Sequence, residues 1–313
     1  KHEFADAVTI DNIYKHFPDQ EIKRRNTGYA IDILSQMQPF NPSGKKFNFC
    51  SLLAGSEGTL SFITEIKLNL VPLPPKHTGL LVVHHKSLTE AIEANLTALE
   101  FNPVAIELID KFLLDCTKKS AEHSRNRFFL SGDPEALLCI EFAEESQDVI
   151  TQKCNEIIIA FKNKGYGFHF PVLFGKDISK VWALRKAGLG LLSNIPGDAK
   201  PQPVIEDTAI SPKKLLPYIE DFNEVLHQNN LTCVYYAHIA TGELHLRPVL
   251  NLKEADGIRL FRVIATEVAR LVKKYNGSLS GEHGDGRLRG EFIQFMIGVE
   301  NYNLLRRIKK TWD

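Results

Sequence analysis

The residues best suited to chemistry lie in two short segments of the C-terminal third of the sequence. The segment YYAHIATGELHLRP contains His238 and His245, and the segment SGEHGDG contains Glu282 and His283. Imidazole and carboxylate groups are the usual ligands of zinc and similar divalent ions in catalytic sites, where an open coordination position binds substrate or water. An imidazole beside such a site can also serve as a general base. These residue types therefore predict a metal site with an adjacent base.

The first segment has the pattern of a β-hairpin. Apolar and polar residues alternate on both sides of Thr241-Gly242, which predicts two strands joined by a two-residue turn. In that arrangement His238 lies directly opposite His245, and opposed residues have Cβ atoms about 4.5–5.5 Å apart on one face of the sheet. We therefore expect the two imidazoles to be close enough to share one ion, with Tyr236 beside them.

The second segment offers the further donor that two histidines need. Side chains of neighbours in an extended segment point in opposite directions, so Glu282 and His283 are not expected to ligate the same ion. One of them would bind the metal and the other would act as a base, and the residues alone leave open which. The alternative is that the histidines are ordinary surface or core residues and that SGEHGDG is only a tight turn.

The elements that must position these residues can be predicted from hydrophobic periodicity. Residues 79–85 and 136–142 have the composition of strands, and each precedes an amphipathic helix, at 88–101 and 149–165. Two such β-α units predict an α+β fold in which helices cover one face of an antiparallel sheet, a ferredoxin-like arrangement. A further helix over 258–275 ends at Asn276-Gly277 and leads into SGEHGDG.

An apolar stretch before these units predicts a domain boundary. Residues 47–53 are expected to form a short strand, 55–58 a turn, and 65–70 a half-buried strand with alternating apolar and polar side chains. The proline-rich residues 71–75 then predict a boundary. The predicted domains are residues 1–75 and 76–313.

Composition excludes several classes of protein. The 313 residues are 43% hydrophobic and 24% charged, with 38 basic and 38 acidic side chains, so no global field favours nucleic acid or anionic lipid. No apolar run approaches the roughly 20 residues of a membrane span, and the first residues do not resemble a signal peptide. The five scattered cysteines predict no iron–sulfur cluster in this chain. We infer a cytoplasmic protein.

Four segments together resemble one protein family. They are NTGYAIDIL, GSEGTLSFITEIKLNLVPLPP, HIATGELHLRP and SGEHGDGRLR. They are similar to segments of FAD-linked oxidases of the vanillyl-alcohol-oxidase and p-cresol-methylhydroxylase type, and most of all to D-2-hydroxyglutarate and D-lactate dehydrogenases, including bacterial proteins that fuse a flavin half to an iron–sulfur half. The resemblance implies the second half of an FAD-binding domain, over 1–75, followed by a ferredoxin-like C-terminal domain that binds substrate and metal.

The resemblance also implies roles for individual residues. The metal ligands fall on His238, His245 and Glu282, and the catalytic base falls on His283. The metal implied is zinc, with manganese as the alternative. Substrate carboxylates are expected to bind Arg185, Lys200 and Arg247, and FAD contacts are expected at Gly28, Tyr29, Gly55, Ser56, Glu57, Gly58, Thr59 and Ile63.

The sequence departs from the family pattern in three places. The usual H-x-G-D-G-N-x-H is HIATGELH here, and Leu189 replaces a polar residue. Arg247 replaces a common Asn, and this change adds a cation for a second substrate carboxylate. The pyrophosphate-binding FAD lobe and a cysteine-rich half are also not recognised within the sequence. We therefore expect these parts as partners, and the resemblance also implies peripheral attachment to a membrane through an electron-acceptor partner. We expect the chain alone to hold FAD weakly or not at all and to be inactive.

The implied function is oxidation of a D-2-hydroxy acid, D-2-hydroxyglutarate or D-lactate, to the 2-oxo acid. The metal would assist, and hydride would pass to the flavin. Two other hypotheses remain: a metal-dependent hydrolase in which Glu282 or His283 activates water, and a non-catalytic binding fragment. The hydrolase is disfavoured because the sequence contains no H-E-x-x-H motif.

Overall fold

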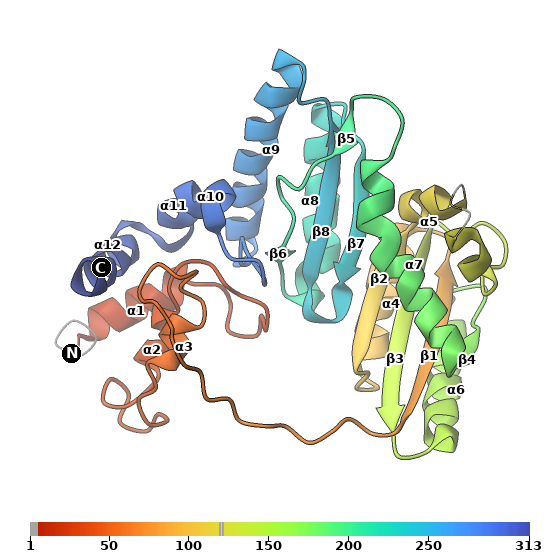
Figure 1. Cartoon of the computed structure of the whole chain (residues 1–313), viewed down its shortest axis with the longest axis horizontal. Coiled ribbons are helices and arrows are strands. Elements are labelled where there is room, and N and C mark those ends of the chain that lie inside the picture. The colour runs from red at the N-terminus through yellow and green to blue at the C-terminus, as the bar shows by residue number, and fades with distance from the viewer. Residues whose placement is uncertain (1–5, 119, 121) are drawn as a thin grey trace. The chain divides into compact units, whose positions relative to one another are not determined.

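The computed structural model describes residues 6–118, 120 and 122–313, except the side chain of Leu189. The chain divides into two compact units (Figure 1). The first unit contains the residues up to Leu70 together with 207–211 and 267–313, and the second contains 71–206 and 212–266. The units thus interleave in sequence, whereas the predicted domains, 1–75 and 76–313, were consecutive; that division stays a prediction.

The second unit is built on an antiparallel sheet. Its strands, in spatial order, are β4 (Val172–Phe174), β1 (His77–His85), β3 (Ala136–Glu144), β2 (Ala105–Asp110), β7 (Cys233–His238), β8 (Glu243–Leu250) and β5 (Lys200–Pro201). Every neighbouring pair in this order is antiparallel. The order β4-β1-β3-β2, with a helix after β1 and another after β3, is the ferredoxin-like arrangement, so the predicted α+β fold is confirmed.

Helices cover both faces of this sheet. α4 (Leu88–Leu99) and α6 (Gln147–Lys164) pack on one face, and α8 (Leu215–Gln228) packs against α4. Ser87 and Ser146 cap the first two helices by accepting main-chain N–H bonds, and Gly165 ends α6 in the left-handed conformation. α5 (Lys111–Lys118) and α7 (Lys176–Ser193) cover the other face (Figure 1).

The face beneath α5 and α7 is the one that carries the chemically interesting residues. Its core contains Leu80, Val82, Ile109, Leu137, Cys139, Val181, Leu184, Val234 and Tyr236. Because strand side chains alternate between faces, Glu107, His238, His245 and Arg247 project on this same side. The apolar core of β1 and β3 therefore gives way to polar side chains on β7 and β8.

The first unit is mainly helical. It contains α1 (Ala7–His16), α2 (Ile31–Ser35), α3 (Cys50–Leu53), α10 (Gly286–Arg289), α11 (Ile293–Ile297) and α12 (Val299–Trp312). A short strand, β6 (Thr208–Ala209), forms a bridge with Ser278. The helix α9 (Ala255–Lys274) begins in the second unit and ends in the first, and Asn276 follows it with a φ of 53°. No helix in the described residues is long and apolar enough to cross a membrane.

Two predicted strands are wrong. Residues 47–53 were expected to form a strand, but Cys50–Leu53 is a helical turn. Residues 65–70 pair with no strand in the described part of the chain, and Leu68 and Leu70 are 81% and 96% exposed. Alternation predicts a strand only where a neighbouring strand and a covering layer exist, and this segment has neither in the structure.

Candidate active site

The hairpin of β7 and β8 brings His238 and His245 together. The register pairs His238 with Glu243 and Tyr236 with His245, so the expected direct opposition of the histidines is wrong. The connection is a 3₁₀ turn, Ile239–Thr241, followed by Gly242 at a φ of 74°, rather than a two-residue turn. A shift by two residues leaves side chains on the same face, and the imidazole centroids are 5.0 Å apart.

A carboxylate on β2 holds the first imidazole. Glu107 Oε1 lies 2.6 Å from His238 Nδ1, and Glu107 Oε2 lies 3.1 Å from Nη2 of Arg185 on α7. The side chains of Glu107 and Arg185 are only 11% and 16% exposed. The shielded carboxylate therefore links an imidazole and a guanidinium, and it fixes the orientation of the His238 ring.

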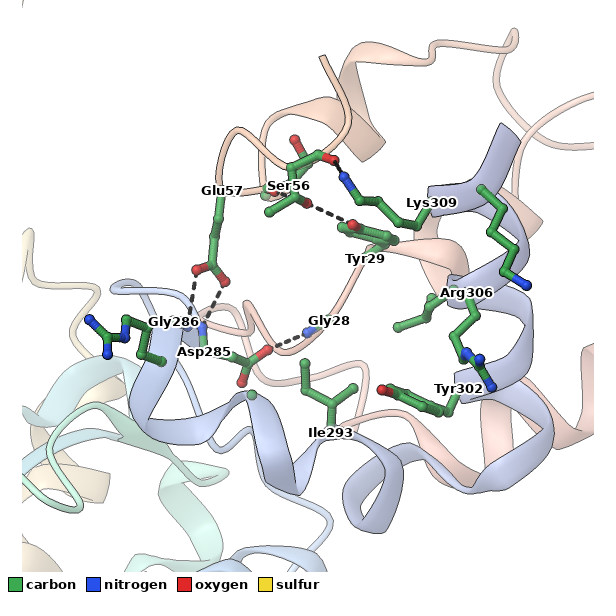
Figure 2. Close-up of a pocket in the computed structure, with 16 residues that line it drawn as sticks. Gly28, Tyr29, Ser56, Glu57, Asp285, Gly286, Ile293, Tyr302, Arg306 and Lys309 are labelled. Atoms are coloured by element: carbon green, nitrogen blue, oxygen red, sulfur yellow. Dashed lines mark hydrogen bonds between the residues drawn. The ribbon is translucent and has the colours of Figure 1, made fainter. Parts of the chain in front are cut away.

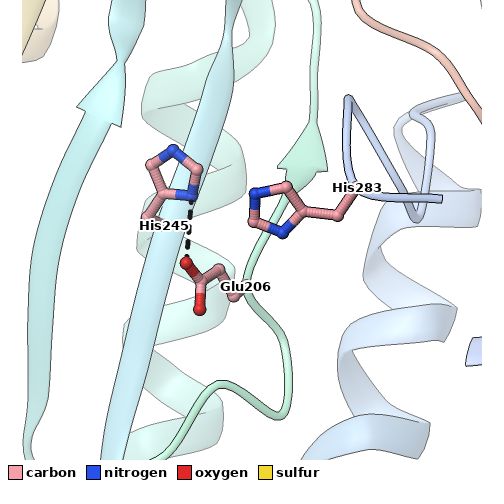
Figure 3. A group of neighbouring side chains, drawn as sticks. All are labelled: Glu206, His245 and His283. Atoms are coloured by element: carbon pink, nitrogen blue, oxygen red, sulfur yellow. Dashed lines mark ion pairs between the residues drawn. The ribbon is translucent and has the colours of Figure 1, made fainter. Parts of the chain in front are cut away.

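The second imidazole also lies near a carboxylate, at a longer distance. His245 Nδ1 lies 3.6 Å from Oε1 of Glu206 (Figure 3), whose other oxygen forms an ion pair with Arg247. The Tyr236 ring stacks on His245 at 5.0 Å, and its hydroxyl accepts a 2.8 Å hydrogen bond from Arg247 Nε. Burial raises the pKa of Tyr236, which keeps the phenol protonated at neutral pH.

Two guanidinium groups stand over this cluster. Arg185 and Arg247 lie 4.7 and 5.9 Å from the centroid of the Tyr236 ring. Burial alone would lower the pKa of Arg247, but its hydrogen bond with Glu206 raises that pKa overall. The cluster therefore combines imidazole donors with two guanidinium groups, each of which pairs with a protein carboxylate.

The remaining predicted carboxylate-binding residue has other contacts. Lys200 begins β5, and its ammonium group donates to the main-chain oxygen of Ile195. The structure thus places Arg185 and Arg247 beside the histidines, whereas Lys200 binds a main-chain oxygen elsewhere in the second unit. The role of all three in binding substrate stays a prediction, as does the expected effect of Leu189, whose side chain lies outside the described residues.

Glu282 and His283 lie on the glycine-rich turn of the first unit. Glu282 forms an ion pair with Arg24, and its Oε1 is 3.6 Å from Nε2 of His283, so the expectation that these neighbouring side chains diverge is wrong. The alternation rule does not apply because the segment is a turn, with Gly284 at a φ of 82°, rather than an extended strand. Since Glu282 belongs to a different unit from the histidine pair, the three-ligand set stays a prediction.

A pocket of about 520 Å³ lies within the first unit (Figure 2). Six of the eight residues expected to contact FAD line it: Gly28, Tyr29, Gly55, Ser56, Glu57 and Thr59. Gly58 and Ile63 are not among the lining residues. Basic side chains of α12, Arg306, Lys309 and Lys310, form another part of its wall. The pocket therefore combines a glycine-rich wall with cationic groups, as a site for an anionic cofactor requires.

Two carboxylates form hydrogen bonds with main-chain groups in the wall of this pocket. Glu57 accepts hydrogen bonds from the main-chain nitrogens of Asp285 at 2.8 Å and Gly286 at 3.0 Å, and Asp285 accepts one from Gly28 N at 2.6 Å (Figure 2). Burial raises the pKa of Asp285 to about 6. A Cβ on Gly284 would lie 2.7 Å from Cδ of Glu57, so the turn needs glycine at that position.

A family model for the C-terminal domain of FAD linked oxidases matches residues 74–313. The chain belongs to the FAD-linked oxidases. D-2-hydroxyglutarate dehydrogenase of Haemophilus influenzae is 32% identical to it over 96% of the chain, and the enzyme of that name from Pseudomonas putida is 33% identical over 94%. The chain spans 29% of the length of each of these relatives.

Solved structures of FAD-linked oxidases share the fold. p-Cresol methylhydroxylase with substrate bound matches 77% of this chain and 51% of its own at a TM-score of 0.53, with 13% sequence identity. This likeness concerns the fold alone.

Sequence reasoning missed the carboxylates that hold the histidines. Glu107 lies inside the apolar segment AIELID, and Glu206 lies beside a second acidic residue inside the apolar segment PVIEDTAI. An acidic residue inside an apolar segment is rarely buried without a partner. That signal could have marked both residues, although it would not have named the histidines as their partners.

Proposed function

We propose that this chain supplies the substrate- and metal-binding part of an FAD-dependent dehydrogenase that oxidises a D-2-hydroxy acid, D-2-hydroxyglutarate or D-lactate, to the 2-oxo acid. The observation that carries the proposal is the pair of imidazoles on one sheet face. Glu107 lies 2.6 Å from Nδ1 of His238, Glu206 lies 3.6 Å from Nδ1 of His245, and each carboxylate pairs with a guanidinium. This combination suits a divalent ion that binds a substrate carrying a carboxylate.

The residues fit a metal by the chemistry of their donors. A ligating histidine usually gives its second ring nitrogen to a carboxylate, and Glu107 occupies that position for His238. Glu206 is the nearby carboxylate for His245, 3.6 Å from its Nδ1. We propose that His238, His245 and Glu282 hold zinc or manganese. A bound divalent ion would lower the pKa of the substrate hydroxyl, as such ions do for water.

The cations near the histidines would bind the carboxylates of the substrate. The planar guanidinium of Arg247 or Arg185 can meet a carboxylate with two parallel hydrogen bonds. Both already pair with a protein carboxylate, Glu206 or Glu107, so a substrate carboxylate would share or replace that partner. We assign Arg247 to the distal carboxylate that D-2-hydroxyglutarate has and D-lactate lacks.

His283 would accept the proton of the substrate hydroxyl. Its side chain is 45% exposed on the glycine-rich turn, and an imidazole near neutral pH is an effective proton acceptor. Glu282 would exchange its ion pair with Arg24 for the metal. The turn therefore contributes one ligand and one base from adjacent positions.

The pocket of the first unit would hold part of FAD. Gly28, Tyr29 and residues 55–59 would contact the cofactor, and the basic residues of α12 would meet its negative charge. Bound flavin would supply the hydride acceptor. The rest of the FAD site, and an iron–sulfur electron-transfer part, are proposed partners of this chain.

The test uses purified holoenzyme and the two enantiomers of 2-hydroxyglutarate and lactate. We expect flavin bleaching and 2-oxo acid formation with a D-enantiomer, loss of both after chelation, and recovery after zinc or manganese is restored. Metal-dependent ester hydrolysis without flavin bleaching would instead favour the hydrolase. Bleaching that resists complete metal removal would contradict the proposed metal role.

A further inference from the structure

We infer that Asp207 is a positioning residue that sets the orientation of Glu282 and His283; this inference rests on the proposed function of those two residues. Asp207 is fully buried in the first unit, with 0% of its surface exposed. Its Oδ1 accepts a hydrogen bond from the main-chain nitrogen of Glu282 at 2.9 Å, and its Oδ2 accepts one from that of His283, also at 2.9 Å. One side chain therefore holds two successive amides of the turn.

Further contacts bring Asp207 and this turn together. Ser280 Oγ donates to Oδ2 of Asp207 at 2.7 Å, and the nitrogen of Gly281 donates to the main-chain oxygen of Asp207 at 2.6 Å. Arg289 lies 3.8 Å from Oδ2 and also donates to the main-chain oxygen of Gly284 at 2.6 Å. Four consecutive residues, 280–283, thus bond to this single aspartate.

The backbone of Asp207 has an unusual conformation. Its φ is 82°, in the left-handed region that residues with a Cβ seldom adopt. Such a conformation persists where surrounding contacts over-determine it, and it is frequent at functional sites. Here the contacts that over-determine it are those with residues 280–283. The conformation therefore serves to aim the carboxylate at the turn.

This geometry requires a carboxylate. Two N–H groups and a hydroxyl point at its two oxygens, and an ionised carboxylate accepts at both. Asparagine has the same shape but only one acceptor oxygen, so its NH₂ would face a main-chain N–H. Asp207→Asn should release one side of the turn and tilt the Cα–Cβ bonds of Glu282 and His283.

The experiment compares Asp207→Asn with Asp32→Asn in the holoenzyme. Asp32 is a matched control because it is 5% exposed, belongs to the same unit and pairs with Arg25 at 2.7 Å. We expect Asp207→Asn to speed amide hydrogen exchange of residues 280–284 by about 10-fold or more. We also expect it to weaken metal affinity and lower kcat by about 10–100-fold with a smaller change in KM. Asp32→Asn should change none of these values.

The exchange measurement separates this inference from the proposed function. If the unaltered holoenzyme neither binds metal nor oxidises 2-hydroxy acids, the proposed function fails, yet the exchange rates still decide whether Asp207 holds the turn. Unchanged exchange in Asp207→Asn, or equal effects in Asp32→Asn, would overturn the inference. If Asp207→Asn does not fold, amide exchange in the unaltered protein provides the test. Amides of Glu282 and His283 that exchange as fast as those of an exposed turn would also overturn the inference.

Discussion

Glu107 Oε1 and His238 Nδ1 are 2.6 Å apart, although the two residues are 131 positions apart in the sequence. The contact joins the middle of β2 to the end of β7 on one face of the sheet. A carboxylate at Nδ1 fixes the tautomer of an imidazole and increases the basicity of its other nitrogen. Nε2 of His238 is thus the nitrogen that would coordinate the proposed metal.

Glu107→Gln is expected to weaken metal binding by about 10–100-fold, because the amide lacks the charge that orients and polarises His238. Glu90→Gln is the matched control, since Glu90 Oε1 lies 3.1 Å from Nδ1 of a buried histidine, His85. Competition with a chelator gives the metal affinity of each variant. A similar loss in both variants would attribute the effect to general destabilisation.

His283→Ala and His245→Ala should fail in different ways. A general base contributes typically about 10²–10⁴-fold to the rate, so His283→Ala should lower turnover by that factor while the metal content stays intact. His245→Ala should lose metal as well as activity. Parallel metal analysis and turnover separate the two roles, and full activity in His283→Ala, or equal metal loss in both variants, would sink the assignment.

Arg247→Lys should discriminate between substrates. The ammonium group keeps the charge beside Glu206 but cannot form the planar two-bond contact with a carboxylate. We expect KM for D-2-hydroxyglutarate to rise about 10-fold, which corresponds to roughly 1.4 kcal/mol, while KM for D-lactate stays unchanged. Equal changes in KM for both substrates would show that Arg247 holds Glu206 and does not bind the distal carboxylate.

Stability should fall at acidic pH because of a buried histidine outside the site. Burial, with the nearby His169 and His85, lowers the pKa of His84 from 6.5 to about 4. The unfolded chain therefore binds more protons than the native protein between these values, so stability is present above about pH 6.5 and is lost as the pH falls toward 4. Each pKa unit corresponds to roughly 1.4 kcal/mol.

Urea titrations across this window measure the free energy of unfolding. In His84→Leu the dependence on pH should flatten, because a leucine side chain does not titrate. An unaltered slope would assign the acid sensitivity to other groups, beginning with His85, whose pKa is also lowered by burial.

Gly284→Ala should weaken FAD binding. A Cβ would lie 2.7 Å from Cδ of Glu57, and Gly284 also has a φ of 82°. Gly165→Ala is the control for backbone strain alone, since its φ is 77° and no atom lies within 4 Å of its added Cβ. We expect both variants to lose about 1–3 kcal/mol of stability. In the holoenzyme, only Gly284→Ala should release flavin on gel filtration, and full retention would argue against the role of this turn.

Local patterns were sufficient to predict the ferredoxin-like core. Helical spacing and the terminal Gly165 are properties of neighbouring residues, and the structure has α4 and α6 where these signals occur. The shared face of His238 and His245 was predictable for the same reason, because alternation has a period of two. Their register was not, because the 3₁₀ turn before Gly242 makes the connection two residues longer than expected.

The supporting carboxylates could not be placed from the sequence. Glu107 meets His238, and Glu206 meets His245, only after distant strands have paired, and no local pattern specifies a contact over such separations. The strand predicted at 65–70 was wrong for a related reason. Its alternation indicates that one face can be buried, but it does not identify a partner strand.

The exposed segment that precedes β1 has a consequence for handling the protein. Phe62, Leu70 and Leu73 are more than nine-tenths exposed, and residues 61–75 belong to no helix or strand. Apolar segments whose N–H and C=O groups have no ladder partner can serve as templates for strand addition between molecules. We therefore expect solubility, rather than folding stability, to limit the concentration that this chain reaches alone. The charge of Lys67 and the prolines after Val71 should oppose strand pairing between molecules.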